Sequence, residues 1–356
     1  MSPGVWVLLT DDGDGQSRTA LVAARALAAA GYRVAATVSA PRSLVGASRS
    51  CERKVPVPPI ADPSFDEHLA AETGGRDYLC VVPASDAAVV KLEPGVAGLL
   101  DKRELAERCR AAGIATPESR EFEDVAALEA AAGDLPYPVV LKPASTVWRP
   151  YSVASEAALR AALPSSGPLL VQPFLTGTLR AVAGVTWGGE IVASVHQRYL
   201  RTWPRGCGGA SAAVSVEPDR GLEEKLGALL EGRDGIFMAQ LVDDVLLDLN
   251  PRVYGSLPLA VAAGANLPAI YCDLLAGRPV ERVRGRAGVA FRWVEGDLRH
   301  VYAGLRDRSL GPGAALKALR PRRGTAHPDV ALSDPRPTVA RLRYALGRRQ
   351  VPAPFG

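Results

Sequence analysis

Residues 235–268 read GIFMAQLVDDVLLDLNPRVYGSLPLAVAAGANLP, and the rest of the chain is organised around them. Two apolar runs, 236–242 and 245–249, flank Asp243 and Asp244. Apolar runs of strand-like composition on either side of a short polar segment predict a β-hairpin.

Three polar residues, Gln240, Asp248 and Asn250, interrupt these apolar runs. A carboxylate buried without a partner is costly, so we expect a cation beside them. Because strand side chains alternate with a period of two, Asp248 and Asn250 share a face. Gln240 joins that face if the turn holds the three residues from Val242 to Asp244. Converging oxygen ligands suit Mg²⁺, which takes one or two carboxylates and completes its octahedron with water and substrate phosphates. The alternative is a sheet face that is simply solvated.

The residues after this hairpin suit the binding of an anion beside the expected cation. Pro251 ends the strand because it cannot donate to the ladder. Arg252 then places a planar guanidinium beside the polar face, where it suits carboxylate or phosphate oxygens. The segment 248–256, DLNPRVYGS, resembles the metal-binding hairpin of the ATP-grasp ligases, which ends in an acid, an apolar residue and Asn-Pro-Arg and continues through Gly-Ser into a helix.

This resemblance implies that Mg²⁺, or Mn²⁺, is held by Gln240, Asp248 and Asn250. The family's acid is normally Glu and here is Asp248. Its first metal ligand falls on Gln240, as in the carbamoyl-phosphate synthetase branch. We therefore expect reduced metal affinity, because two carboxylates have become one short carboxylate and one amide. The resemblance covers roughly residues 1–280.

The composition is that of a globular protein with ample core. The length of 356 residues suggests about two or three domains, and 47% hydrophobic against 22% charged residues fits a soluble chain. The apolar run 5–9 is too short for a signal peptide or a membrane span. The five cysteines are scattered without CxxC spacing, which favours a reduced, cytoplasmic setting.

The charge is concentrated at the C-terminal end. Residues 281–356 hold 16 Lys and Arg against 6 Asp and Glu, which leaves 26 against 32 before them. Arginine clusters bind nucleic acid or acidic lipid, but the acidic residues of the body balance this basic tail. We expect it, with a final helix after Pro337, to pack on the body, attract substrate or form an oligomer contact. No nucleic-acid or membrane partner is predicted, and a homo-oligomer stays open.

Residues 1–100 alternate between strand and helix patterns, with strands predicted at 5–10, 32–39 and 78–85 and a helix at 17–30. The loop after the first strand, DDGDGQSR, places Arg18 where a dinucleotide fingerprint needs its third small residue. Its three aspartates would also repel a pyrophosphate, so nicotinamide binding is disfavoured. The ATP-grasp resemblance implies a Rossmann-like pre-ATP-grasp domain here, with Asp11, Arg18 or Asp86 lining part of the substrate site.

Two lysines stand out in the middle of the chain. The segment 101–119, DKRELAERCRAAGIATPES, resembles the family's Asp-Lys helix and places Lys102 on a nucleotide phosphate; the alternative is an amphipathic helix with a surface lysine. Lys142 lies in a strand bounded by prolines, 136–145, where it is expensive to bury unpaired. The family's second ATP lysine matches it.

The loop 144–152 that follows, ASTVWRPYS, has no glycine, whereas the family closes a glycine-rich loop over the phosphates. Ser145, Thr146 and Arg149 supply donors instead, or the loop holds the phosphates poorly.

The segment 169–177, LLVQPFLTG, is an apolar strand that breaks at Pro173. It resembles the hinge between the two ATP-grasp subdomains. The resemblance implies that backbone groups of Gln172, Phe174 and Leu175 bond the adenine edge.

Residues 185–195 alternate like two strands around Gly188 and Gly189. His196, Arg198, Arg201 and Arg205 then precede a glycine-rich loop predicted at 206–211. Arginines beside backbone amides suit an anionic intermediate, and the alternative is a solvated edge strand. Cys207 has no base or orienting group near it in the sequence and is interpreted as a bystander.

The chain as a whole is therefore expected to combine α/β and α+β structure. The predicted parts are a Rossmann-like domain over 1–100, an ATP-grasp domain over 101–280 with a hinge at 169–177, and a basic extension over 281–356. The resemblance implies a ligase that joins small-molecule carboxylate and amine substrates. The carboxylate attacks the γ-phosphate of Mg-ATP, Arg252 with Arg198 or Arg201 stabilises the acyl phosphate, and an amine then forms an amide. Two alternatives stay open: a thiol, bicarbonate or hydroxyl acceptor, and an ATP-binding module without turnover.

Overall fold

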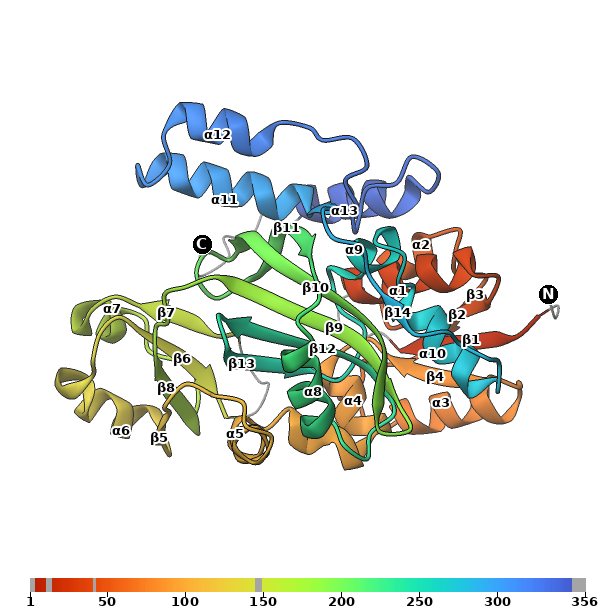
Figure 1. The fold of residues 1–356 in the computed structure, drawn as a ribbon, viewed down its shortest axis with the longest axis horizontal. Coiled ribbons are helices and arrows are strands. Elements are labelled where there is room, and N and C mark those ends of the chain that lie inside the picture. The colour runs from red at the N-terminus through yellow and green to blue at the C-terminus, as the bar shows by residue number, and fades with distance from the viewer. Residues whose placement is uncertain (1–3, 11–14, 41–42, 145–148, 348–356) are drawn as a thin grey trace.

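The computed structural model describes residues 4–10, 15–40, 43–144 and 149–347. Within these ranges the strands form a four-stranded parallel sheet, a seven-stranded mixed sheet and a four-stranded antiparallel sheet. In Figure 1 the seven-stranded sheet lies in the middle, with the parallel sheet to its right and the antiparallel sheet to its left. Three positions considered in the sequence, Asp11, Ser145 and Thr146, lie outside the described residues.

The parallel sheet is built from the first part of the chain. Its strands run in the order β3-β2-β1-β4, which is the order of the first four strands in a doubly wound sheet. The bounds are β1 Trp6–Thr10, β2 Arg33–Val38, β3 Arg53–Pro56 and β4 Cys80–Pro83. All five residues of β1 are buried, as expected for a central parallel strand covered on both faces.

Helices join and cover the parallel strands. The predicted helix at 17–30 is confirmed as α1, Arg18–Ala29, which begins where the Ser17 hydroxyl accepts a hydrogen bond from the amide of Ala20. It ends before Gly31, whose φ of 88° is a left-handed conformation that favours glycine. The other helices of this region are α2 Leu44–Ala47, α3 Phe65–Gly74, α4 Asp86–Leu92 and a 3₁₀ turn at Pro94–Leu99.

The antiparallel sheet has the strand order β5-β8-β6-β7. Its strands are β5 Arg120–Phe122, β6 Val139–Pro143, β7 Tyr151–Val153 and β8 Leu169–Pro173. The helical elements beside it in the chain are α5 Lys102–Ala111, α6 Val125–Ala130, the 3₁₀ turn Ala132–Asp134 and α7 Glu156–Ala161. Lys142 lies in β6, and the predicted hinge segment 169–177 consists of β8 and the four residues after it.

The seven-stranded sheet has the order β13-β12-β9-β10-β11-β15, with β14 paired to β10. Its strands are β9 Leu179–Trp187, β10 Glu190–Trp203, β11 Gly209–Val216, β12 Gly235–Val242, β13 Val245–Asn250, β14 Val283–Arg284 and β15 Ala290–Arg292. The predicted turn at Gly188 and Gly189 is confirmed, and both glycines have positive φ. The glycine-rich loop predicted at 206–211 is shorter than expected, because β11 already begins at Gly209.

Two cores cover the two faces of this sheet. One contains buried residues of α5 and of α8, Arg220–Leu229. The other contains residues of α1, of α9, Leu257–Ala262, and of α10, Leu267–Leu275, and so joins the large sheet to the parallel sheet.

The basic tail is more than a short extension with one helix. Its strands β14 and β15 complete the large sheet, and it carries α11 Val294–Arg306, α12 Pro312–Leu319 and α13 Arg336–Gly347. Figure 1 shows α11 and α12 as a pair of blue helices above β10 and β11. Helix α11 contacts both strands, so the tail packs on the body. No helix in the described ranges is long and apolar enough to span a membrane.

Candidate nucleotide-binding site

The hairpin of β12 and β13 brings Gln240 directly opposite Asp248. The sequence predicted that Gln240 shares a face with Asp248 through a three-residue turn, and the length of the turn was wrong. The turn holds only Asp243 and Asp244, with Asp243 at a φ of 49°. The register shifts after Gln240, because Leu247 is an extra residue without a partner, as in a β-bulge. The bulge supplies the odd residue that the turn lacks.

The same registry extends across the large sheet. Gln240 pairs with Ala181 of β9, and Ala181 pairs with Gln197 of β10, so these side chains share the face of Asp248. Asn250 pairs with Met238, two residues along on the same face. The predicted sharing of one face by Gln240, Asp248 and Asn250 is therefore present in the registry.

A cavity of about 510 Å³ lies between the antiparallel sheet and the large sheet, within the size range of small-molecule sites. It brings together residues from widely separated stretches of the chain, from Lys102 to His300. Its charged and polar lining includes Lys102, Lys142, Gln172, Arg198, Arg201, Gln240, Asp248 and His300, and its apolar lining includes Val140, Phe174, Leu175, Val242 and Leu247.

Two lysines and one carboxylate meet in this cavity. The Lys102 ammonium donates to the Asp248 carboxylate in a short ion pair. Lys142 is 7% exposed and donates to the carbonyl of Leu247 at 3.0 Å, so the bulged residue also positions the second lysine. Burial lowers the pKa of Lys142, although the charge of Asp248 partly opposes this. Burial by itself raises the pKa of Asp248, but Lys102, Lys142 and Arg252 outweigh it and hold that pKa below its usual value.

The hinge segment forms an apolar wall of the cavity through Phe174 and Leu175. The Gln172 side chain is buried and donates to the Ser119 hydroxyl at 2.8 Å. The Phe174 amide already donates to the carbonyl of Pro138 at 3.0 Å, so it is not free for a ligand. The Leu175 amide has no backbone acceptor among the described residues.

The three arginines proposed from the sequence have different surroundings. Arg252 pairs with Asp86 at 2.6 Å and donates to the Asn250 side-chain oxygen at 2.9 Å, and neither Arg252 nor Asn250 lines the cavity.

Arg201 lines the cavity, but its guanidinium binds the fully buried Asp297 of α11 through both carboxylate oxygens, at 2.5 and 3.0 Å. Arg198 also lines the cavity, is exposed, and has no hydrogen-bond partner within the described ranges. It is the one of these three arginines whose donors are available.

No protein-family profile and no curated protein sequence matches the chain. Among solved structures it is similar to an L-amino acid ligase from Bacillus licheniformis, with a TM-score of 0.57 and 14% identity, over 79% of this chain and 76% of that one. It is also similar to N5-carboxyaminoimidazole synthase from Aspergillus clavatus in complex with ADP and 5-aminoimidazole ribonucleotide, at 0.59 and 16% over 82% of each chain. Biotin carboxylase from Campylobacter jejuni matches at 0.54 and 13%, over 77% of this chain and 71% of that one. The chain has the ATP-grasp fold.

One residue of the ATP-grasp cavity was missed by sequence reasoning. His300 of α11 lines it, and its Nδ1 donates to the carbonyl of Thr202 at 2.9 Å, since a carbonyl only accepts. His300 lies in the basic tail, beyond the segment that resembles the ATP-grasp ligases. The amphipathic pattern of residues 294–306 predicts a helix but does not say which strand it covers.

The polar face of the ATP-grasp hairpin partly suits Mg²⁺. Gln240 and Asp248 present one amide and one carboxylate to the cavity, which fits an ion bound mainly through phosphate oxygens and water. Asn250 is a weaker candidate because Arg252 donates to its side-chain oxygen. No group of three His, Cys, Asp or Glu in the described part of the chain is arranged to hold a metal without substrate.

Cys207 also lines the cavity. Burial raises the pKa of its thiol, and Ser152 and Lys142 offset this only in part. A thiol rather than a thiolate at neutral pH agrees with the interpretation of Cys207 as a bystander.

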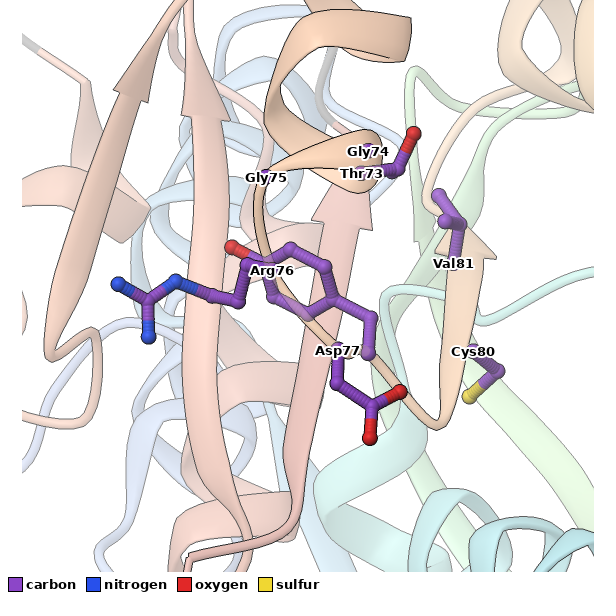
Figure 2. Close-up of a pocket in the computed structure, with 8 residues that line it drawn as sticks. Thr73, Gly74, Gly75, Arg76, Asp77, Cys80 and Val81 are labelled. Atoms are coloured by element: carbon purple, nitrogen blue, oxygen red, sulfur yellow. The ribbon is translucent and has the colours of Figure 1, made fainter.

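A second hollow, of about 460 Å³, lies on the parallel sheet and shares no lining residue with the first cavity. It is formed by the segment between α3 and β4, at the amino end of a parallel strand (Figure 2). Ligands of open α/β sheets bind at the carboxyl ends instead. Figure 2 shows the side chains of Arg76 and Asp77 extending in different directions, so no charged groups converge there.

Proposed function

We propose that the protein is an ATP-dependent carboxylate-amine ligase that forms an amide through an acyl phosphate. The observation that carries this proposal is the meeting of Lys102, Lys142 and Asp248 in one cavity of an ATP-grasp fold. Two cations beside one carboxylate leave a net positive site, which suits a polyphosphate accompanied by a divalent ion. The solved N5-carboxyaminoimidazole synthase of the same fold holds ADP, which supports a nucleotide here.

The chain's residues would act by positioning and by neutralising charge. Lys102 and Lys142 would bind phosphate oxygens, and the hinge at Phe174 and Leu175 would pack against the base. Arg198 would stabilise the negative charge that develops as a substrate carboxylate attacks the γ-phosphate. The amine of a second substrate would then displace phosphate and leave an amide.

Mg²⁺, or Mn²⁺, would be held by Gln240 and Asp248 with phosphate oxygens, and Asn250 would join them only if Arg252 moves. A bound divalent ion would neutralise the phosphates and polarise the γ-phosphoryl group. In this proposal residues 101–280 form the ATP-grasp unit, 1–100 the preceding unit and 281–356 the extension. The free thiols of all five cysteines fit the reduced, cytoplasmic setting that the sequence favours.

A second candidate is an ATP-binding module without turnover. The observation that favours it is the engagement of the polar hairpin residues by other side chains: Lys102 on Asp248, and Arg252 on Asn250. A chain of this kind would bind ATP and gain thermal stability from it, but would release no ADP.

The test is ADP release from Mg-ATP with pools of amino acids and other carboxylates, with hydroxylamine added to trap any acyl phosphate. We expect a hydroxamate with the native protein and none with Asp248→Ala, while the exposed Asp244→Ala on the same hairpin behaves as the native protein. ATP-dependent thermal stabilisation without ADP from any pool would favour the module. Failure to bind ATP at all would reject both.

A further inference from the structure

Several buried polar atoms of the described residues have no hydrogen-bond partner, and two of them belong to Trp293 and Asp329. The atoms are the indole Nε1 of Trp293 and Oδ1 of Asp329, and the hydroxyl of Ser211 is a third. Trp293 and Asp329 are 9% and 7% exposed. The Trp293 amide donates to the Ser211 carbonyl at 2.8 Å, so these two residues are adjacent. Buried polar atoms are rarely left unpaired in a protein, so such a group marks a place for a ligand or an ordered water.

Arg18 lies against this group. It is the first residue of α1, and its guanidinium carbon stacks 3.4 Å from the centre of the Trp293 ring. Stacking of this kind holds the guanidinium plane and leaves its edge, with the N–H groups, open for a planar anion. Arg18 makes no ion pair with a described residue. Burial lowers the pKa of Arg18 to about 10, so it remains a cation at neutral pH.

The two carboxylates near Arg18 differ in how many of their oxygens are already bonded to other side chains. Glu295 is bound through both oxygens by Arg341, at 2.9 and 3.0 Å, and also by Arg299. Asp329 is the carboxylate whose charge acts most strongly on Arg18, yet the two form no ion pair and Oδ1 of Asp329 is unpaired. Burial raises the pKa of Asp329, with Arg18 only partly opposing. A cation and an anion are therefore held near each other without being joined.

One link joins this group to the proposed nucleotide-binding cavity. Arg149, which also acts on the charge of Arg18, directly precedes Pro150, a residue of the cavity lining.

We propose that Arg18, Trp293 and Asp329 form a binding site for a zwitterionic α-amino acid. The Arg18 edge and the Trp293 N–H would donate to the α-carboxylate, and Oδ1 of Asp329 would accept from the α-ammonium. A ligand with both charges on one carbon satisfies all three groups at once, which a simple carboxylate or amine does not. The role of this amino acid as the amine substrate rests on the proposed ligase function, whereas its binding does not.

The experiment is isothermal titration calorimetry without nucleotide, using each common L-amino acid and then the methyl ester and the N-acetyl derivative of the best binder. We expect binding of at least one amino acid and a loss of about tenfold or more in affinity for each derivative. Arg18→Gln and Asp329→Asn should each lower the affinity to a similar degree. Arg18→Lys, which keeps the charge but loses the planar fork, should also bind more weakly.

The matched control is Arg33→Gln. Arg33 also stacks on a tryptophan, with its guanidinium carbon 4.1 Å from the Trp6 ring centre, but lies on the surface beside Glu52. The Arg33→Gln variant should bind amino acids as the native protein does, and circular dichroism should show that all variants are folded.

Two results would overturn the inference: no amino acid binds, or the ester and N-acetyl derivatives bind as well as the amino acid. Hydroxamate formation in the same preparation separates this from the proposed function. Amino-acid binding without ATP turnover would support the amino-acid site and reject the ligase. Turnover without any zwitterion-specific binding would reject the amino-acid site and support the ligase.

Discussion

Glu223 and Asp248 are two carboxylates with basic side chains beside them, but only Asp248 lines the cavity between the antiparallel and large sheets. Oε1 of Glu223 accepts from the Ser194 hydroxyl and from Nε2 of His196, the latter at 3.1 Å, and Oε2 accepts from Arg284 at 2.9 Å. Nδ1 of His196 in turn accepts from the Asp219 amide, which places the ring proton on Nε2.

Asp248 has one ammonium partner, Lys102, on one oxygen. Its side chain is 36% exposed, while that of Glu223 is 7% exposed. The difference shows which charges maintain the fold and which are available to a ligand. A carboxylate whose oxygens are all bonded inside the protein has no capacity left for substrate. A carboxylate that is half bonded and opens on a cavity keeps that capacity.

The largest expected effect is on stability, from Glu223→Ala. The change leaves His196 and Arg284 without their acceptor, and breaking a buried charge pair from one side costs about 3 to 5 kcal/mol. We expect the free energy of unfolding, measured in urea, to fall by about this amount. Glu224→Ala on the same helix, where the side chain is exposed, should change it by less than about 0.5 kcal/mol. A small loss for Glu223→Ala would remove the contrast with Asp248.

Asp248→Asn should have the opposite profile. The variant removes a charge from the proposed phosphate end of the cavity, so we expect kcat to fall about 10²- to 10³-fold, which is about 2.7 to 4 kcal/mol in the barrier. Its Tm should fall by less than that of Glu223→Ala, because the amide of the new side chain still offers an acceptor oxygen to Lys102. A Tm loss as large as that of Glu223→Ala, with kcat unchanged, would show that Asp248 is structural.

Arg198 and Arg201 test the same contrast on one strand. Arg201→Ala removes two hydrogen bonds to the buried Asp297 and should lower the free energy of unfolding by about 1.5 to 3 kcal/mol. Arg198→Ala should leave it within about 0.5 kcal/mol and instead lower kcat. Urea unfolding and steady-state rates on both variants separate the roles. Equal stability of the two variants would contradict the assignment.

The smallest expected effect is on the pH dependence of stability. The hydrogen bonds from His196 and Ser194 and the charge of Arg284 together outweigh burial and lower the pKa of Glu223 below its ordinary value of 4.5. Its stabilising contribution is therefore complete above about pH 4.5 and is lost as the pH falls through the folded-state pKa. The gap in unfolding free energy between the native protein and Glu223→Gln should shrink between pH 5 and pH 3. A gap that stays constant would mean that the pKa is not lowered.

The sequence predicted elements better than contacts. The apolar runs and the Asp-Asp pair between them were sufficient to predict the hairpin. The cost of burying Lys142 in a strand was sufficient to identify it as a candidate site residue. The bulge at Leu247 was not predictable, because one extra residue in a strand leaves no mark in an apolar run. That single residue sets which side chains face Asp248.

Residues whose position depends on distant segments were also beyond prediction. Arg198 and Arg201 look alike in the sequence, and only the buried Asp297, about a hundred positions later, distinguishes them. His300 reaches the cavity because α11 packs on β10, and the helix pattern of α11 alone does not indicate a partner strand. The tail was expected to pack on the body, but not to complete the large sheet.

The contacts of Asp334 have a consequence for synthesis on the ribosome. This buried carboxylate binds Arg25 of α1 at 3.0 Å and also accepts from the Ser48 hydroxyl. It therefore joins the segment just before α13 to the helices beside the parallel sheet. Arg25 and Asp334 are 309 residues apart. At the usual 5 to 20 residues per second, about 15 to 60 s pass between the synthesis of one and of the other. During that interval the segment that contains Arg25 exists without its partner, and the two segments come together only after Asp334 has been synthesised.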